Sequence, residues 1–225
     1  MLNGLRAAAA RTNASAATTT AANAAKTAAS TSPTTQSPAM PSDPRLVGLG
    51  RRPLSTVVAP TQMKDGKVTD PGHIQYQTTE EERAATPGLQ ESYGHSRRTD
   101  LPATERTRVK GTLPDGTPFN VPGLKGPAID YGSDKTLPRN ASTKIIDHGT
   151  LSPEQAAILR DAGQQPMMPH YETSGADEAN CVHAHAEMAR KLGMDPGAVH
   201  KHARPQDLGQ QMEGLKLDDS AGDKK

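Results

Sequence analysis

The sequence has few of the large apolar side chains that build a protein core. Its 225 residues include no Trp and one Phe, together with 16 Leu, 8 Val and 5 Ile. Leu, Ile, Val and Phe thus make up well under ~20% of the chain, the level below which a sequence struggles to repay the entropy of ordering itself. Much of the other hydrophobic content is Ala, which buries little area. The composition therefore predicts at most one small core beside long extended or disordered stretches.

Cysteine is also scarce, and neither sign of charge dominates. The single Cys excludes an internal disulfide, and with it the class of disulfide-stapled secreted domains. Lys and Arg number 26 against 25 Asp and Glu, so the net charge of +1 gives no general attraction to nucleic acid or anionic membranes. No apolar run approaches the ~18 residues of a membrane-spanning helix, and we expect no membrane span.

Residues 1–55 form a compositionally distinct leader. It is rich in Ala, Ser and Thr, and no acidic residue occurs before Asp43. A cationic, hydroxylated and acid-free leader is typical of a mitochondrial transit peptide, and Arg51–Thr56 is similar to the junctions at which such peptides are cleaved. This pattern predicts a protein of the mitochondrial matrix. Two alternatives stay open, namely the low-complexity tail of a cytoplasmic protein and the leader of an exported bacterial effector.

The next segment, 56–107, is polar and interrupted by four prolines, without a sustained period of two or of 3.6 residues. We expect an extended or disordered arm with one helical turn at Thr79–Arg83. Residues 108–122 predict a β-hairpin, because a Pro-Asp-Gly turn lies between two alternating runs. Pro presets the first turn angle, and Gly accepts a positive φ.

The region 144–216 is the part that we expect to fold by itself, as a small helical module, with a frayed tail at 217–225. A short strand at 143–146 precedes its helices. The expected helices lie at 153–163, 176–192, 195–203 and from 205 onward. The predicted fold class is therefore a mostly disordered or extended N-terminal half, followed by a small α-rich (α+β) C-terminal module with one β-hairpin.

The only cysteine lies in the string Asn-Cys-Val-His at 180–183. This string resembles the Asn-Cys-x-His start of the nucleophile helix in circularly permuted papain-like hydrolases and acyltransferases of the lecithin retinol acyltransferase kind. The resemblance implies that Cys181 is a nucleophile whose base is a histidine from an upstream strand, a part that His148 or His170 would take. It covers four residues, and Ala occupies the following positions that are usually aromatic in the family. The alternative is a buried thiol that packs as a small hydrophobe.

A second hypothesis for this region is a zinc site. Cys181 and His185 are four residues apart on one helical face, and thiolate and imidazole are donors that Zn²⁺ prefers. His200 or His202 would complete the ligand set. No Cys-x-x-Cys pair accompanies them, although a structural zinc site takes four ligands. We therefore expect no cofactor, with zinc as the alternative, and solvated histidines beside an ordinary Cys as the simpler interpretation.

Residues 185–204 also resemble a helix-turn-helix. They have the A-x3-G-x5-V spacing, in which Ala permits close helix approach, Gly makes the turn and Val anchors the second helix. That second helix would present His200, Lys201 and Arg204 to a major groove and its phosphates. Pro205 would cut it short, and the alternative is a small helical hairpin whose Ala, Gly and Val serve packing alone.

These features favour a binding protein over an enzyme. A chain with little core of its own can fold in part on a larger protein assembly, whose contacts supply the missing burial. The leading hypothesis is a non-catalytic, organelle-targeted binding or assembly protein. The alternatives are a helix-turn-helix-like nucleic-acid-binding module and a Cys181-dependent hydrolase or acyltransferase, which includes an exported bacterial effector.

Overall fold

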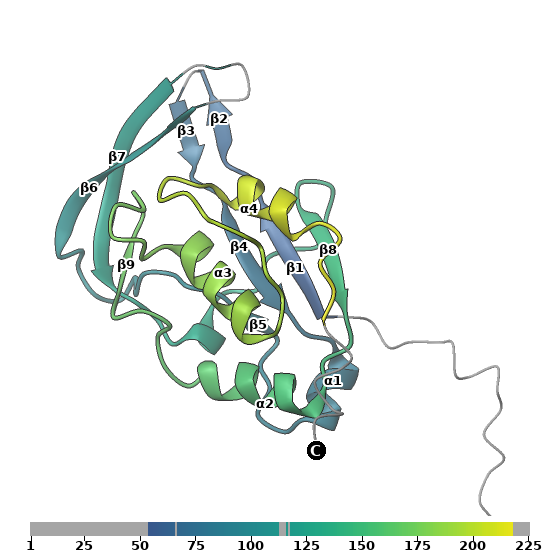
Figure 1. The fold of residues 1–225 in the computed structure, drawn as a ribbon. Coiled ribbons are helices and arrows are strands. Elements are labelled where there is room, and N and C mark those ends of the chain that lie inside the picture. The colour runs from purple at the N-terminus through teal and green to yellow at the C-terminus, as the bar shows by residue number, and fades with distance from the viewer. Residues whose placement is uncertain (1–53, 66, 113–115, 117, 218–225) are drawn as a thin grey trace, which may run out of the picture. The chain divides into compact units, whose positions relative to one another are not determined.

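The structure is a computed structural model that describes residues 54–217, with gaps at 66, 113–115 and 117. The described part is a sheet-rich α+β fold, in which nine strands form three antiparallel sheets (Figure 1). The prediction of a largely unstructured N-terminal half and an α-rich C-terminal module is therefore wrong. Most of the predicted leader and tail lie outside the described residues.

The elements follow one another in this order: β1 (Leu54–Ala59), β2 (Gln62–Lys64), β3 (Lys67–Asp70), β4 (His73–Gln77), α1 (Glu80–Ala85), β5 (Ser92–Tyr93), β6 (Glu105–Thr112), β7 (Pro118–Pro127), a 3-10 turn η1 (Tyr131–Ser133), β8 (Lys144–Gly149), α2 (Pro153–Ala162), β9 (His170–Glu172), α3 (Cys181–Lys191) and α4 (Pro205–Met212).

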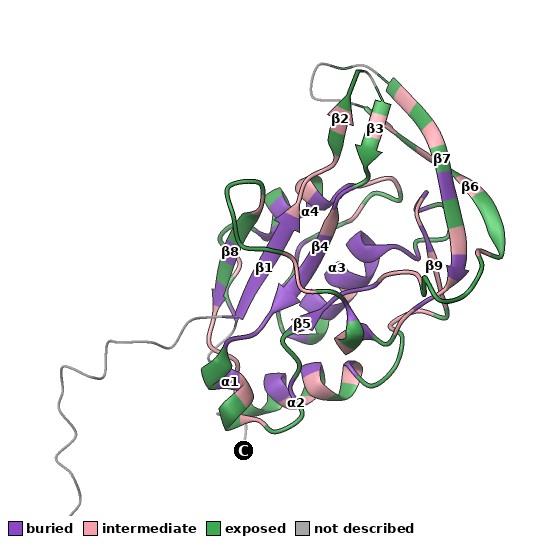
Figure 2. Cartoon of the chain, turned by 180° about the vertical axis from the view of Figure 1, so that it is seen from behind, coloured by how far each residue is buried: buried purple, intermediate pink, exposed green. Residues whose placement is uncertain are grey.

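The central sheet has the strand order β5-β4-β1-β8, and the helices α3 and α4 cover one of its faces (Figure 1). Thr56 of β1 pairs with Tyr76 of β4 on one side and with Ile146 of β8 on the other. A second sheet has the order β6-β7-β9, and β2 pairs with β3 in a separate hairpin. Burial concentrates in β1, β4 and α3, whereas β6 alternates between exposed and half-buried positions (Figure 2).

The segment predicted to be an extended arm supplies five strands and α1. One reason for this correction is that the core uses residue types that a census of Leu, Ile, Val and Phe does not count. Tyr76, Tyr93 and Tyr131 are fully buried, and so are Met188 and Met212. A buried aromatic side chain covers about 150–250 Å², so the tyrosines supply core area although the chain has few Phe and Trp residues.

A second reason is that the buried strand β4 is rich in polar residues. Gln75 and Gln77 lie on the face of the sheet opposite Tyr76, and a segment of the chain after η1 covers them. Gln77 donates from Nε2 to the Leu137 carbonyl at 2.8 Å, and Gln75 accepts from the Leu137 amide at 2.6 Å. Because their buried amides are hydrogen-bonded, the strand needs no apolar alternation on this face.

Of the helices that local sequence signals predicted in the C-terminal region, one is confirmed, one begins later than expected and one is absent. The helix after Ser152 is confirmed, with the predicted cap, a Pro in its first turn and Gly163 at its end. The helix expected from 176 begins five residues later, because Asn180 caps it by accepting hydrogen bonds from the amides of Val182 and His183. The helix expected over 195–203 is absent, and α4 then begins at Pro205.

The predicted hairpin region holds β6 and β7, which pair over their whole length, with Val109 opposite Val121. The strands are longer than expected, and β9 pairs with the far end of β7. Among the described residues, no helix combines the length and apolarity that crossing a membrane requires.

Candidate functional site

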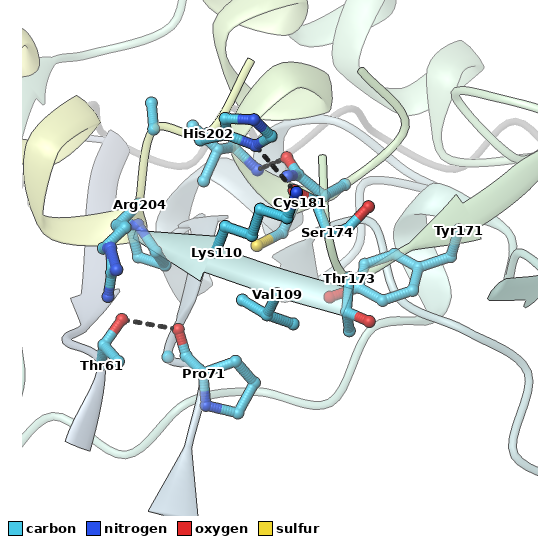
Figure 3. Close-up of a pocket in the computed structure, with 15 residues that line it drawn as sticks. Thr61, Pro71, Val109, Lys110, Tyr171, Thr173, Ser174, Cys181, His202 and Arg204 are labelled. Carbon is cyan, nitrogen blue, oxygen red and sulfur yellow. Dashed lines mark hydrogen bonds between the residues drawn. The ribbon is translucent and has the colours of Figure 1, made fainter. Parts of the chain in front are cut away.

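A narrow pocket lies where the second sheet meets the start of α3 (Figure 3). Its wall comes from β6, from the turn before β4, from β9 and the chain that follows it, from the first turn of α3 and from the segment leading into α4. The described lining residues include one thiol and three basic side chains, and none is Asp or Glu: Thr61, Pro71, Gly72, Val109, Lys110, Tyr171, Thr173, Ser174, Asn180, Cys181, Val182, His202, Ala203, Arg204 and Pro205.

Cys181 is the first residue of α3 and lines this pocket, with 5% of its surface exposed. Its position is fixed by Asn180, whose side-chain oxygen also contacts Nδ1 of His183 at 2.8 Å. The first turn of a helix carries amides without intrahelical partners and the positive end of the helix dipole. A thiol at this position therefore lies where developing negative charge is stabilised.

His73 and Asp134 form a closely bonded pair beside the central sheet. His73 Nε2 lies 2.5 Å from Asp134 Oδ2, and their side chains are 18% and 5% exposed. Ser96 donates to the other carboxylate oxygen at 2.8 Å, and Gln75 donates to Oδ2 at 3.2 Å. Burial raises the pKa of Asp134, but the hydrogen bond and charge of His73 outweigh this and hold it below its ordinary value. Asp134 is therefore an ionised, immobilised acceptor for the imidazole.

His73 also interacts with Cys181. Burial alone would lower the pKa of His73, but the charge of Cys181 and hydrogen bonds with Asp134 and Cys181 raise it to about 10. Gly72, which precedes His73, lines the same pocket as Cys181. Since Asp134 occupies Nε2, Nδ1 is the ring nitrogen left for a second partner. A carboxylate thus orients an imidazole whose protonated form is favoured by both Asp134 and Cys181.

The approach of His73 to Asp134 depends on a glycine. A β-carbon at Gly94 would lie 1.9 Å from Asp134 Oδ2 and 3.1 Å from His73 Nε2. The first distance is far inside van der Waals contact, so any larger residue would displace the carboxylate. Gly94 follows β5 directly, and this edge of the sheet therefore leaves space for the pair.

Tyr171 of β9 lines the same pocket as Cys181. Burial raises the pKa of its phenol well above the ordinary value, and the charge of Cys181 and a hydrogen bond with it act in the same direction. The hydroxyl therefore remains protonated and is a hydrogen-bond donor. Tyr171 and Arg204 lie on opposite sides of Cys181 in the pocket (Figure 3).

The two histidines that the sequence suggested as bases lie elsewhere. His170 is partly exposed, and its Nε2 lies 3.3 Å from Asp177. Both ring nitrogens of His148 are engaged, Nδ1 with the Leu215 carbonyl at 2.9 Å and Nε2 with the Thr56 hydroxyl at 2.7 Å. His148 therefore has no ring nitrogen left for the thiol, and neither histidine is among the described lining residues of the Cys181 pocket.

His148 belongs instead to a buried network under α3. The Thr56 hydroxyl contacts Nε2 of both His148 and His185, at 2.7 Å and 2.9 Å. Because His148 donates from Nδ1 to a carbonyl, its Nε2 accepts from Thr56, and Thr56 in turn accepts from His185. The His185 ring stacks on Tyr76 with centroids 3.8 Å apart. Burial lowers the pKa of both histidines, so both rings are neutral and the network is structural.

The four zinc candidates do not come together. Cys181 lines the pocket, His185 is buried against Tyr76, and His200 is exposed. His202 lines the pocket with Cys181, but its Nδ1 faces the Ser174 carbonyl at 3.2 Å. Within the described part of the chain, no group of three His, Cys, Asp or Glu side chains could hold a metal ion.

The helix-turn-helix geometry is also not formed. Because residues 195–203 contain no helix, the element that would enter a groove does not exist. His200 and Lys201 are exposed on this irregular segment. Arg204 is buried, and its guanidinium lies over the Phe119 ring at 3.9 Å from the centroid.

Sequence reasoning missed His73 and Asp134. Their only sequence signal is weak: a His that directly follows Pro-Gly and opens a strand. Nothing in the spacing of residues 73, 134 and 181 shows that they converge. The chain matches no protein-family model, and comparisons with curated proteins and with solved structures find no similar protein.

Proposed function

We propose that this chain is a cysteine-dependent hydrolase or acyltransferase. Cys181 is the nucleophile, His73 is the general acid and base, and Asp134 orients His73. The observation that carries the proposal is the Asp134–His73 pair, with 2.5 Å between the carboxylate and the imidazole, together with the effect of Cys181, the first residue of α3, on the pKa of that imidazole. A nucleophile served by a base that a third group orients is the usual arrangement of an activated nucleophile.

The first step transfers an acyl group to sulfur. The Cys181 thiolate attacks the carbonyl carbon of an ester, thioester or amide, and the imidazolium of His73 gives its proton to the leaving oxygen, sulfur or nitrogen. A thioester with Cys181 forms and the original bond breaks. The phenol of Tyr171, which stays protonated beside the sulfur, is placed to donate a hydrogen bond to the developing oxyanion.

The second step releases the acyl group. His73 takes a proton from water in the hydrolase reaction, or from an acceptor hydroxyl or amine in the acyltransferase reaction, as that group attacks the thioester. Sulfur leaves as the thiolate, and the starting state is restored. Asp134 keeps its negative charge throughout and stabilises the imidazolium.

The leading hypothesis from the sequence, a non-catalytic assembly protein, rested on the apparent lack of a core in residues 56–107. That segment contributes strands β1 to β5, including the fully buried Tyr76 and Tyr93. The lack of a core in this segment therefore no longer supports folding on a partner, and the hypothesis of an assembly protein stays an untested alternative. Organelle targeting and binding to a larger assembly stay predictions without a supporting contact in the described residues.

The proposal is tested by the alkylation rate of Cys181 with iodoacetamide, read by mass spectrometry. Cys181 is the chain's single cysteine, so the label is unambiguous. At pH 6, where an ordinary thiol is protonated, we expect His73→Gln and Asp134→Asn to lower the rate about tenfold or more. The wild type should also form an acetyl thioester with p-nitrophenyl acetate, and Cys181→Ala should not.

The chain offers a matched control. His170 and Asp177 are also a His–Asp pair, 3.3 Å apart, but they do not contact the thiol. His170→Gln and Asp177→Asn should therefore leave the labelling rate unchanged. Equal rates for the wild type and His73→Gln, with both proteins folded, would refute the proposal and favour a buried structural thiol.

A further inference from the structure

The pocket of Cys181 contains a buried cation, Arg204, that forms no ion pair with the described residues. Arg204 lines it, is 8% exposed, and its Nη2 is buried without a hydrogen-bond acceptor. No described carboxylate lies within ion-pair distance of its guanidinium. The charge of Asp207 acts on the guanidinium, but its carboxylate forms no ion pair with it and accepts from the backbone amide of Arg204 at 2.9 Å. Burying an ionised group without a close ion-pair partner is unfavourable, so this arrangement needs a reason.

The surrounding structure holds the guanidinium in place. Its Cζ lies 3.9 Å from the centroid of Phe119 on β7, a cation–π contact that fixes the plane of the group. On the neighbouring strand, Gly111 is paired with Phe119. A β-carbon at Gly111 would lie 1.8 Å from Nη2, so the position has room for Arg204 because Gly111 has no side chain. The site is therefore preorganised around the charge.

The other charged side chains of the pocket also favour an anionic ligand. Lys110 of β6 and His202 also line it, and none of its described lining residues is acidic. Figure 3 shows Lys110 and Arg204 on the wall around Cys181. A guanidinium presents a planar fork of donors that matches an oxyanion with two oxygens.

We infer that Arg204, with Lys110, is an anion-binding subsite of the Cys181 pocket, and that the acyl substrate carries a carboxylate or phosphate group next to the bond that is attacked. This inference rests on the proposed function, because it assigns the substrate class of that same site. The substrate anion supplies the counter-charge that Arg204 lacks. Binding it also places the acyl carbon beside Cys181.

The test compares two alkylating reagents on the full-length protein. Iodoacetate carries a carboxylate, whereas iodoacetamide has nearly the same shape without the charge. With both, the Cys181 sulfur forms a bond to the methylene carbon and iodide leaves. We expect Arg204→Gln to lower the iodoacetate rate relative to the iodoacetamide rate about tenfold, which corresponds to ~1.4 kcal/mol. Arg204→Lys should keep part of the preference, since it keeps the charge.

Lys201→Gln is the matched control, since it removes a nearby but exposed cation that does not line the pocket. Its ratio of the two rates should equal that of the wild type. A wild-type ratio in Arg204→Gln would overturn the inference. If His73→Gln leaves the iodoacetamide rate unchanged, the proposed function fails. The ratio of the iodoacetate rate to the iodoacetamide rate in Arg204→Gln still tests the anion-binding subsite in that case.

A second measurement covers the case in which Arg204→Gln does not fold. Acetate or inorganic phosphate, at constant ionic strength, should protect wild-type Cys181 from iodoacetamide in a saturable manner, and acetamide should not. Stronger protection by acetate assigns the subsite to a carboxylate, and stronger protection by phosphate assigns it to a phosphoryl group. Protection by neither anion would overturn the inference.

Discussion

Replacing Thr56 by Val tests the buried network that supports α3. Valine keeps the volume of threonine but removes the hydroxyl that accepts from His185 and donates to His148, at 2.9 Å and 2.7 Å. The change leaves one imidazole nitrogen of each histidine without a partner. Nδ1 of His185 already lacks one, so no change of tautomer can rescue that ring.

The expected cost follows from the number of groups that lose their partner. A buried polar group that loses its hydrogen bond costs about 1–3 kcal/mol, so two such groups predict a loss of ~2–6 kcal/mol in the free energy of unfolding. For a domain of this size that is a large fraction of its total stability. The assay is urea denaturation at pH 7.5, with the midpoint and the slope fitted together.

The control is Thr56→Ser, which keeps the hydroxyl and removes one buried methyl group. We expect it to cost about 1 kcal/mol, the usual price of a small cavity, and to be clearly more stable than Thr56→Val. If Thr56→Val unfolds at the wild-type urea concentration, the hydroxyl does not bridge the two histidines and the assignment of both rings as neutral members of one network is wrong.

Two further predictions concern pH and the His73 pair. Burial lowers the folded-state pKa of His148 and His185, so below pH ~6.5 the unfolded chain binds more protons. The stability that these two histidines contribute is complete above that pH and should fall by up to about 1.4 kcal/mol per pH unit for each of them as the pH decreases. The raised pKa of His73 acts in the opposite direction above pH ~6.5, so urea midpoints are compared at about pH 6 and pH 5, and equal midpoints there would contradict the prediction. Gly94→Ala would place a β-carbon 1.9 Å from Asp134 Oδ2, so the rate of iodoacetamide labelling of Cys181 should drop to that of Asp134→Asn. A wild-type labelling rate in Gly94→Ala would show that the His73–Asp134 pair can shift without changing the reactivity of the thiol.

Local signals in the sequence predicted local structure. The capping of α2 by Ser152 and its end at Gly163 depend on bonds within a few residues, and both were predictable. The start of α3 was not, because Ser174 and Asn180 are both acceptable caps by sequence. The tertiary structure selects Asn180, because residues 170–172 form strand β9 and α3 begins only at Cys181.

The core was underestimated because its composition is unusual. Fully buried Tyr76, Tyr93 and Tyr131 replace the expected Phe and Trp. The polar strand β4 is buried because a distant segment supplies hydrogen bonds to Gln75 and Gln77. Periodicity counts only apolar residues, so it cannot detect a strand whose buried face is satisfied by polar contacts from elsewhere.

What the sequence by itself determined is which chemistry the chain can supply and where some short elements begin and end. It provides one thiol within a predicted helix, and no second cysteine to close a disulfide. What only the tertiary structure decided is which groups meet that thiol. His73, Asp134 and Arg204 lie between 23 and 108 residues from Cys181 along the chain. The tertiary structure brings Arg204 into the Cys181 pocket and pairs His73, the neighbour of the pocket residue Gly72, with Asp134. Side-chain contacts over such separations depend on strand order and register, which no local pattern encodes.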